Sequence, residues 1–191
     1  MLFGHDVELW LGRVVDLANT EPRSENDEDG LADLAALQAF VERHDVSEVG
    51  VLTRADLRGV QLLRAQVRPL FGASTDQDAA DRVNALVARS PVTPRLTDHD
   101  GYHWHMHYIA PGAGLAERLS VDCGMALAQV VSLGERTRLR VCEAPDCSRV
   151  LVDLSRNRSR RYCDARTCGN RLHVAAYRER RRGGTEAGTG T

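Results

Sequence analysis

Apolar residues recur every three or four positions through most of the first 135 residues, which is the spacing of helices with one buried face. We predict five helices, over about residues 7–18, 31–41, 53–70, 76–88 and 114–134. The third should begin at a capping box, because Thr53 and Asp56 lie three residues apart and each can satisfy the other's backbone N–H. Cys123 falls on the apolar face of the fifth helix, so we interpret it as a small core residue.

The pattern changes to strict alternation between residues 102 and 108, which is the period of a β-strand. The two faces of this strand hold Tyr102, Trp104, Met106 and Tyr108 on one side and His103, His105 and His107 on the other. A turn signal at Asp100 and Gly101 pairs the strand with residues 94–98, which predicts a β-hairpin near 94–110.

Shorter elements are predicted beyond residue 135. Strands over 138–141 and 150–154 flank a turn at 143–146, and a helical stretch over 169–182 follows. The core side chains of this piece should be Leu139, Val141, Val150, Val152, Leu172 and Val174. Residues 183–191 have nothing to bury and should be disordered. The fold class is therefore mainly α, with a β-hairpin in an N-terminal domain (1–135) and a β-hairpin plus helix in a small C-terminal module (138–182).

Composition and charge add two conclusions. The chain is 42% hydrophobic and 27% charged, which provides a core but no apolar run near the roughly 18 residues of a membrane helix. Its start lacks a secretion signal, so we expect a cytoplasmic protein with no membrane partner. All 25 basic residues are arginine, and residues 136–182 hold 14 of them against five acidic residues. An acidic body with a basic C-terminal piece predicts two modules with different partners.

Four of the five cysteines form two pairs, Cys142-x4-Cys147 and Cys163-x4-Cys168, separated by fifteen residues. Two thiol pairs joined by a hairpin-forming spacer are typical of a structural zinc site. Four thiolates complete a tetrahedral shell and leave no position for a catalytic water. We predict one structural Zn²⁺ in a treble-clef-like finger. The alternatives are two disulfides, four buried thiols, or a site in which His173 replaces one cysteine.

Two segments resemble known families. Ser155-Arg-Asn-Arg-Ser-Arg-Arg-Tyr-Cys163 followed by Cys168-Gly-Asn-Arg171 is similar to the CGNR zinc finger, with Tyr162 where tryptophan is expected. Val15-Asp-Leu-Ala-Asn-Thr20 and Trp104-His-Met-His107 resemble the ABATE domain, which accompanies this finger in bacterial proteins. Such proteins are described as stress-induced transcription regulators, so the resemblance implies DNA binding.

Arginines gather around the cysteines, and guanidinium groups bind phosphate bidentately. The candidate nucleic-acid contacts are Arg156, Arg158, Arg160, Arg161, Asn170, Arg171, Arg178, Arg180, Arg181 and Arg182. Tyr162 and Tyr177 are too few for a single-strand stacking platform, and the family resemblance favours double-stranded DNA over RNA. The alternatives are that these charges are merely solvated, or that Asn170 and Arg171 tie the helix to the zinc knuckle.

The histidine strand is a second candidate site. His103, His105 and His107 span too great a length for all three to bind one ion unaided. The alternatives are a polar strand face, a small-ligand pocket beside Trp104, or a second metal site in which two neighbouring histidines join an Asp or Glu from another element. A hydrolase would use the three histidines with Asp98 or Asp100.

We therefore predict a zinc-binding, DNA-binding transcription regulator that senses a signal or an unknown small ligand through its N-terminal domain, and not an enzyme. A homodimer is expected, because one small module supplies few base contacts. Two rivals stay open. One is a metal-dependent hydrolase using the histidine strand, which lacks a recognisable motif such as HExxH. The other is an adaptor whose finger binds an acidic protein.

Overall fold

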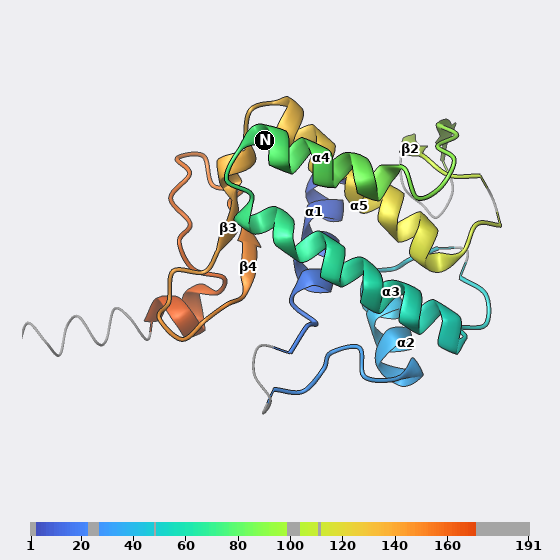
Figure 1. Ribbon diagram of the computed structural model, residues 1–191, viewed down its shortest axis with the longest axis horizontal. Helices are drawn as coiled ribbons and strands as arrows, with labels where there is room; N and C mark the ends of the chain where they lie inside the picture. The colour runs from blue at the N-terminus through green and yellow to red at the C-terminus, as the bar shows by residue number, and fades with distance from the viewer. Residues whose placement is uncertain (1–2, 23–26, 48, 99–103, 111, 171–191) are drawn as a thin grey trace, which may run out of the picture.

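The computed structural model describes residues 3–22, 27–47, 49–98, 104–110 and 112–170 (Figure 1). The helices in these ranges are α1 (His5–Ala18), α2 (Leu34–Arg43), α3 (Arg54–Val67), α4 (Asp76–Val87) and α5 (Leu115–Ser132). The short helical turns are η1 (Arg68–Gly72), η2 (Arg136–Arg138) and η3 (Ala165–Gly169). The strands are β1 (Arg95–Thr97), β2 (His105–His107), β3 (Leu139–Val141) and β4 (Val150–Val152). The described chain is mainly α with two antiparallel hairpins, as predicted.

Helix boundaries follow local chemistry. The predicted capping box is confirmed, because the Asp56 backbone N–H donates to Thr53 and the Asp56 carboxylate accepts from the Thr53 N–H. We predicted that the second helix begins at residue 31, but Asp33 caps α2, which begins at Leu34. Leu31 is therefore buried before the helix and not inside it. The third predicted helix reaches Leu70 only as the η1 turn, because Pro69 has no N–H with which to continue the α-helical ladder.

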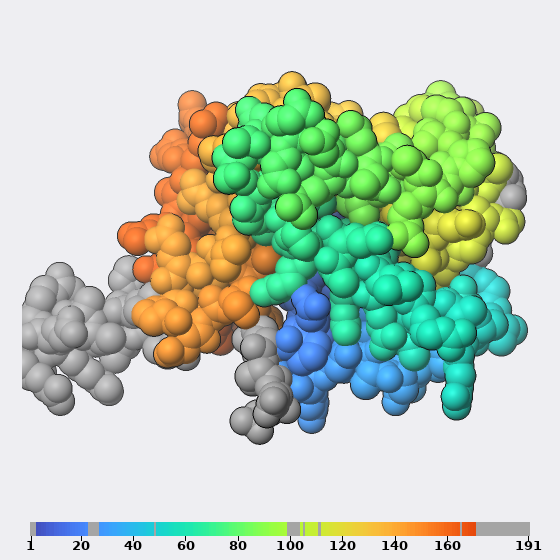
Figure 2. All heavy atoms as spheres, in the orientation of Figure 1, coloured from blue at the N-terminus to red at the C-terminus, as the bar shows by residue number. Residues whose placement is uncertain are grey.

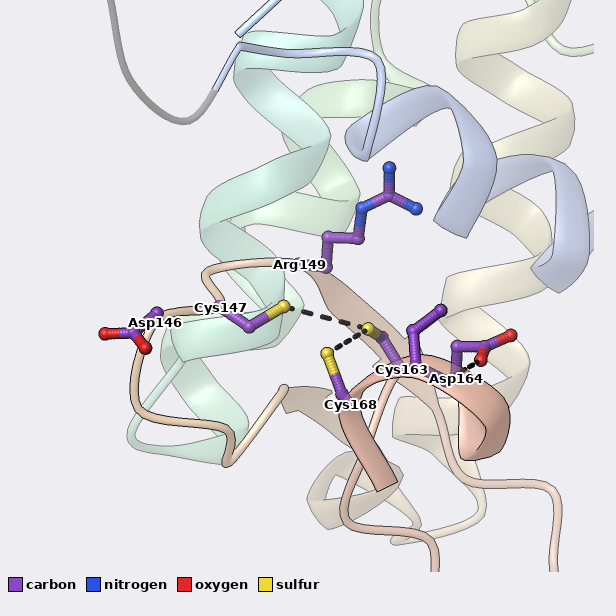
Figure 3. A pocket seen from close by; sticks show the side chains of 7 residues that line it. Asp146, Cys147, Arg149, Cys163, Asp164 and Cys168 are labelled. Carbon is purple, nitrogen blue, oxygen red and sulfur yellow. Dashed lines mark hydrogen bonds between the residues drawn. The ribbon is translucent and has the colours of Figure 1, made fainter. Parts of the chain in front are cut away.

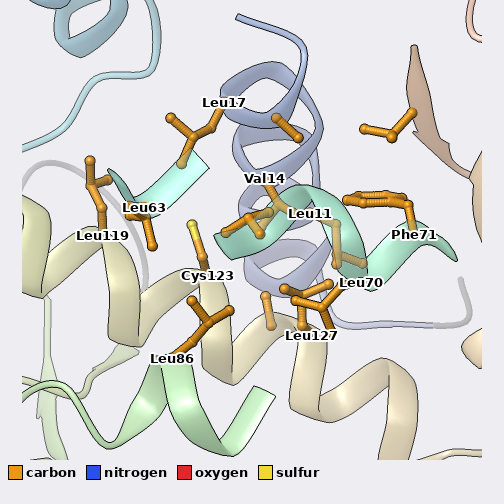
Figure 4. Packing of buried hydrophobic residues seen from close by; sticks show 14 of the residues in the cluster. Leu11, Val14, Leu17, Leu63, Leu70, Phe71, Leu86, Leu119, Cys123 and Leu127 are labelled. Atoms are coloured by element: carbon orange, nitrogen blue, oxygen red, sulfur yellow. The ribbon is translucent and has the colours of Figure 1, made fainter. Parts of the chain in front are cut away.

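The core lies between α1, α3, α4 and α5 (Figure 4). Leu11, Leu63 and Leu127 are fully buried there, and burial of each contributes about 1.5–3 kcal/mol. Cys123 is 1% exposed, which confirms it as a core residue. Gly124 lets α4 approach α5 closely, since a Cβ at this position would lie 2.7 Å from Val87.

Strand β4 joins the C-terminal hairpin to this core. Val150 and Val152 belong to the helical core, whereas Leu151 packs in a second cluster with Cys142 and Cys168. The prediction that Val141 is a core residue is wrong, because its side chain is 44% exposed. Val141 is the last residue of β3, and no other described element covers it there. The surface of residues beyond 136 runs directly into that of the helical part in Figure 2. The domain boundary between 135 and 138 stays a prediction.

The side chain of Asn19, at the C-terminal end of α1, binds the backbone of β4. Its Nδ2 donates to the Val150 carbonyl and its Oδ1 accepts from the Val150 N–H, both at 2.9 Å. The side-chain amide therefore satisfies the two backbone groups that a neighbouring strand would otherwise pair. Arg68 adds a second tie, since it donates to the Ser148 carbonyl and pairs with Glu21 at 3.4 Å.

Thr20, the next residue, anchors the loop before α2. Its carbonyl accepts from the Gly30 N–H at 2.9 Å and from Arg64 at 3.2 Å. Arg64 also bonds Asp29, which lowers the pKa of that carboxyl. Gly30 lies close to Thr20, because a Cβ there would be 3.1 Å from Thr20 and would push the two segments slightly apart. The Asn-Thr end of the segment that resembles the ABATE domain therefore positions both β4 and this loop.

The predicted N-terminal hairpin is present but shorter than expected. Its register pairs Leu96 with Met106 and Arg95 with His107. Leu96 and Trp104 are 60% and 65% exposed. The turn at 99–103 and all residues from 171 onward lie outside the described residues, including the predicted terminal helix and tail. No described helix is both long and apolar enough to span a membrane.

Substituting Asn19→Ala should lower the free energy of unfolding by about 2 kcal/mol, because it leaves the N–H and carbonyl of buried Val150 unpaired. Urea denaturation measures this change. Asn84→Ala, on the exposed face of α4, is the matched control and should change stability by less than about 0.5 kcal/mol. If both variants changed the free energy of unfolding equally, the stabilising role of the Asn19–Val150 hydrogen bonds would be contradicted.

Asp122 on α5 should make stability depend on pH. Burial raises its pKa to about 7, although Arg118 and Arg13 favour its charged form. Between pH 3.8 and about 7 the folded carboxyl holds a proton that the unfolded chain has released, so stability falls by about 1.4 kcal/mol per pH unit. Asp122→Asn removes this loss. The free energy of unfolding of Asp122→Asn, minus that of the parent protein, should therefore rise between about pH 5 and about pH 7. A difference that does not change with pH would contradict the raised pKa of Asp122.

Candidate zinc centre and arginine loop

The four paired cysteines converge on one point. All four Sγ atoms lie within 4.8 Å of one another, and Cys163 Sγ is 3.7 Å from the Sγ of both Cys147 and Cys168. A tetrahedral zinc ion with Zn–S bonds of about 2.3 Å separates its sulfurs by about 3.8 Å, so this donor set fits zinc. All five cysteines are free thiols, which disfavours the disulfide alternative. His173 lies outside the described residues.

Local hydrogen bonds build both halves of the site. The Cys142 N–H donates to the Arg149 carbonyl at 2.8 Å, which closes the loop after β3. In the second half, the Asp164 carboxylate accepts from the N–H groups of Arg166 and Thr167, at 2.8 and 2.7 Å, and so caps the turn that carries Cys168. The halves also bond to each other, because the Cys163 N–H donates to Cys142 Sγ at 3.4 Å.

The cysteines differ in exposure. Cys142 and Cys168 are buried, at 5% and 7% exposed, whereas Cys147 and Cys163 are half-buried. An open cavity of about 480 Å³ adjoins three of them (Figure 3). Its lining is Asp146, Cys147, Arg149, Cys163, Asp164, Thr167 and Cys168. Cys142 is absent from that lining and packs instead with Ala144 and Leu151.

Buried Asp153 orders the arginine loop, residues 155–161. Its carboxylate accepts from the Ser155 N–H and the Arg160 N–H, both at 2.9 Å. Burial opposes ionisation of Asp153, but hydrogen bonds from Ser155 and Arg160 outweigh it, and the pKa is lowered. The charged carboxylate is thus satisfied within the fold, and the loop backbone closes around it.

Two arginines that we did not predict as functional support the same loop. Arg138 is 4% exposed and donates to Glu135 at 2.6 Å and to the Ser155 carbonyl at 2.7 Å. Arg140 donates to the carbonyls of Arg158 and Arg160 at 3.0 and 3.1 Å. The sequence signal for this role was weak, since charge alone does not distinguish a supporting arginine from a surface one.

The predicted nucleic-acid contacts that lie within the described residues divide into two groups, those paired within the protein and those exposed. Arg158 pairs with Glu135 at 2.8 Å, Arg160 donates to the Cys163 carbonyl at 2.6 Å, and Arg161 pairs with Glu143 at 2.5 Å. Arg156 and Asn170 are exposed, and Arg156 makes no side-chain hydrogen bond or ion pair within the described part of the chain. The other predicted contacts lie outside the described residues: Arg171, Arg178, Arg180, Arg181 and Arg182.

The histidine strand lies only partly within the described residues. His105 and His107 lie in β2, and Trp104 precedes that strand. Among the residues that the structure describes, the four cysteines are the group of metal-ligating side chains close enough to share an ion. His103 and Asp100 lie outside those residues, so the ligand pocket and the second metal stay predictions.

The helical core and the four-thiolate site define a zinc finger protein with one structural Zn²⁺. The family model of the CGNR zinc finger matches residues 138–181, and that of ABATE, described as "Putative stress-induced transcription regulator", matches residues 12–134. The chain therefore belongs to the ABATE family and carries a CGNR zinc finger, which confirms both resemblances. Neither family is described as an enzyme. No curated protein matches the chain.

Elemental analysis should find one zinc per chain, and Cys142→Ser or Cys163→Ser should abolish it, because three thiolates do not complete the site. Cys123→Ala is the matched control and should retain the metal, since Cys123 lies in the helical core. A second, chelatable metal lost with His105→Ala would instead support the hydrolase alternative.

Proposed function

We propose that this protein regulates transcription by binding double-stranded DNA through its finger. The observation that carries the proposal is the group of exposed arginines near the zinc site, next to an arginine loop whose backbone Asp153 orders. The family description of a transcription regulator supports it. Phosphate contact by such groups supplies affinity without sequence readout.

The structure suggests which arginines are available for phosphate. Arg149 and Arg156 are exposed and make no side-chain hydrogen bond or ion pair within the described residues, and Arg166 is exposed on η3. Arg158 and Arg160 instead brace the loop through Glu135 and the Cys163 carbonyl. We therefore assign phosphate contact first to Arg149, Arg156 and Arg166, and positioning to Arg158 and Arg160.

Arg161 shares features of both the phosphate-contacting and the positioning arginines. Its ion pair with Glu143 is exposed, at 61% and 44% for the two side chains. Exposed pairs contribute only about 0–1 kcal/mol, so a DNA phosphate can replace the Glu143 carboxylate at little cost. Arg161 is then a phosphate contact that Glu143 holds in place until DNA binds.

The N-terminal domain would supply the signal in this scheme. Asn19 and Arg68 tie α1 and η1 directly to the loop and strand beside the zinc site. A ligand or a second copy of the chain bound to the helical domain could act on the finger through these contacts. The ligand pocket, the homodimer and the cytoplasmic location are parts of the proposal.

Arg156→Ala/Arg166→Ala should weaken binding to a random-sequence duplex and lower the slope of log affinity against log salt by about 2, one for each lost phosphate contact. Fluorescence anisotropy at graded salt measures both. Arg54→Ala/Arg58→Ala is the matched control, because α3 begins at the end of the molecule remote from the finger, and it should change neither value (Figure 1).

Glu143→Gln should raise DNA affinity, because it removes a negative charge beside Arg161. No DNA association at low salt, even with the zinc site loaded, would overturn the proposal and favour the adaptor that binds an acidic protein.

A further inference from the structure

The zinc site adjoins an open cavity. The half-buried thiols, Cys147 and Cys163, lie on the cavity, whereas Cys142 is sheltered behind them against Leu151. Figure 3 shows the sulfurs of Cys147 and Cys163 directed toward one another across this opening. Cys168 also lines the cavity but is buried, so Cys147 and Cys163 are the more accessible of the three cysteines to a small solute that enters it.

The backbone also favours reaction at this pair. Cys147 ends a turn in which Pro145 and Asp146 are exposed and whose closing bond is the Cys147 N–H to the Ala144 carbonyl at 3.0 Å. Its sulfur is 3.7 Å from that of Cys163. Cys168 is 7% exposed and sits in a turn that Asp164 caps, and Cys142 Sγ accepts the Cys163 N–H. The Cys147 turn is therefore the part of the site that can most readily shift to the roughly 2.05 Å of a disulfide bond.

We propose that Cys147 and Cys163 form an oxidation site for hydroperoxides. One thiolate attacks the peroxide oxygen, which breaks the O–O bond and forms a sulfenic acid. The second thiolate attacks that sulfur, forms the disulfide and expels hydroxide. In sum, two thiolates, one hydrogen peroxide and two protons give one disulfide and two waters, with two electrons passing from sulfur to oxygen.

This reaction would open the finger. Neither disulfide sulfur remains a thiolate, so Cys142 and Cys168 alone cannot retain Zn²⁺. Leu151 packs against the same cysteines, and Asp153, around which the arginine loop closes, follows two residues later. Peroxide would thereby convert an ordered basic surface into a disordered one. The proposal does not rest on DNA binding, because zinc and the disulfide are measured directly.

The test treats the zinc-loaded full chain with graded hydrogen peroxide and follows zinc with a chromogenic chelator, with mass spectrometry of non-reduced peptides. We expect one zinc released per chain together with a Cys147–Cys163 disulfide, at a rate at least about tenfold above oxidation of Cys123, which is fully buried. Thiol reductant plus zinc should restore the site. Zinc retained under these conditions, or Cys142–Cys147 or Cys163–Cys168 as the first disulfide, would overturn the proposal.

A shielding variant tests the role of the opening without removing a ligand. Thr167 lines the cavity and is exposed, so Thr167→Phe should slow zinc release several-fold while one zinc per chain is retained. Thr137→Phe, exposed but outside the cavity lining, is the matched control and should leave the rate unchanged. Equal rates for both variants would contradict entry through this cavity.

Discussion

Strand β4 is buried on both of its faces, and this constraint organises the molecule. Val150 and Val152 complete the helical core, while Leu151 packs against the cysteines. A strand of three residues has few hydrogen bonds of its own, so its remaining backbone groups need partners from elsewhere. Asn19 provides two of them. The helical core and the zinc-site cluster therefore meet at one shared strand.

This sharing changes the energetic role of the metal. A module of about 45 residues alone buries too little apolar surface to fold, and zinc then supplies the deficit. Here Leu139 and the two outer residues of β4 are covered by helices instead. The four cysteines pack in the second cluster with Ala144 and Leu151, and there Zn²⁺ would join the two halves of the site.

Charge is used in two ways within the same basic segment. Arg138 and Arg140 donate hydrogen bonds to carbonyl and carboxylate groups of the protein, and these bonds support the conformation of the arginine loop. Asp153, with no exposed surface, is the acidic centre around which that loop closes. The loop backbone that carries Arg156 is thereby ordered, while the Arg156 side chain itself stays exposed. The high arginine content therefore reflects internal support as well as surface charge.

Local pattern was sufficient for much of this protein. Helical periodicity, the Thr53 capping box and the cysteine spacing each depend on residues near one another in the chain, so they predicted the helices and the zinc ligands. They did not predict that Val141 is exposed, that Asn19 binds Val150, or that Arg140 is structural. Those outcomes depend on which surfaces meet over separations as large as 131 residues. Sequence alone determined the elements and the ligand set, whereas tertiary packing decided which polar groups hold the fold and which remain exposed to solvent, because only packing determines which of them lose water.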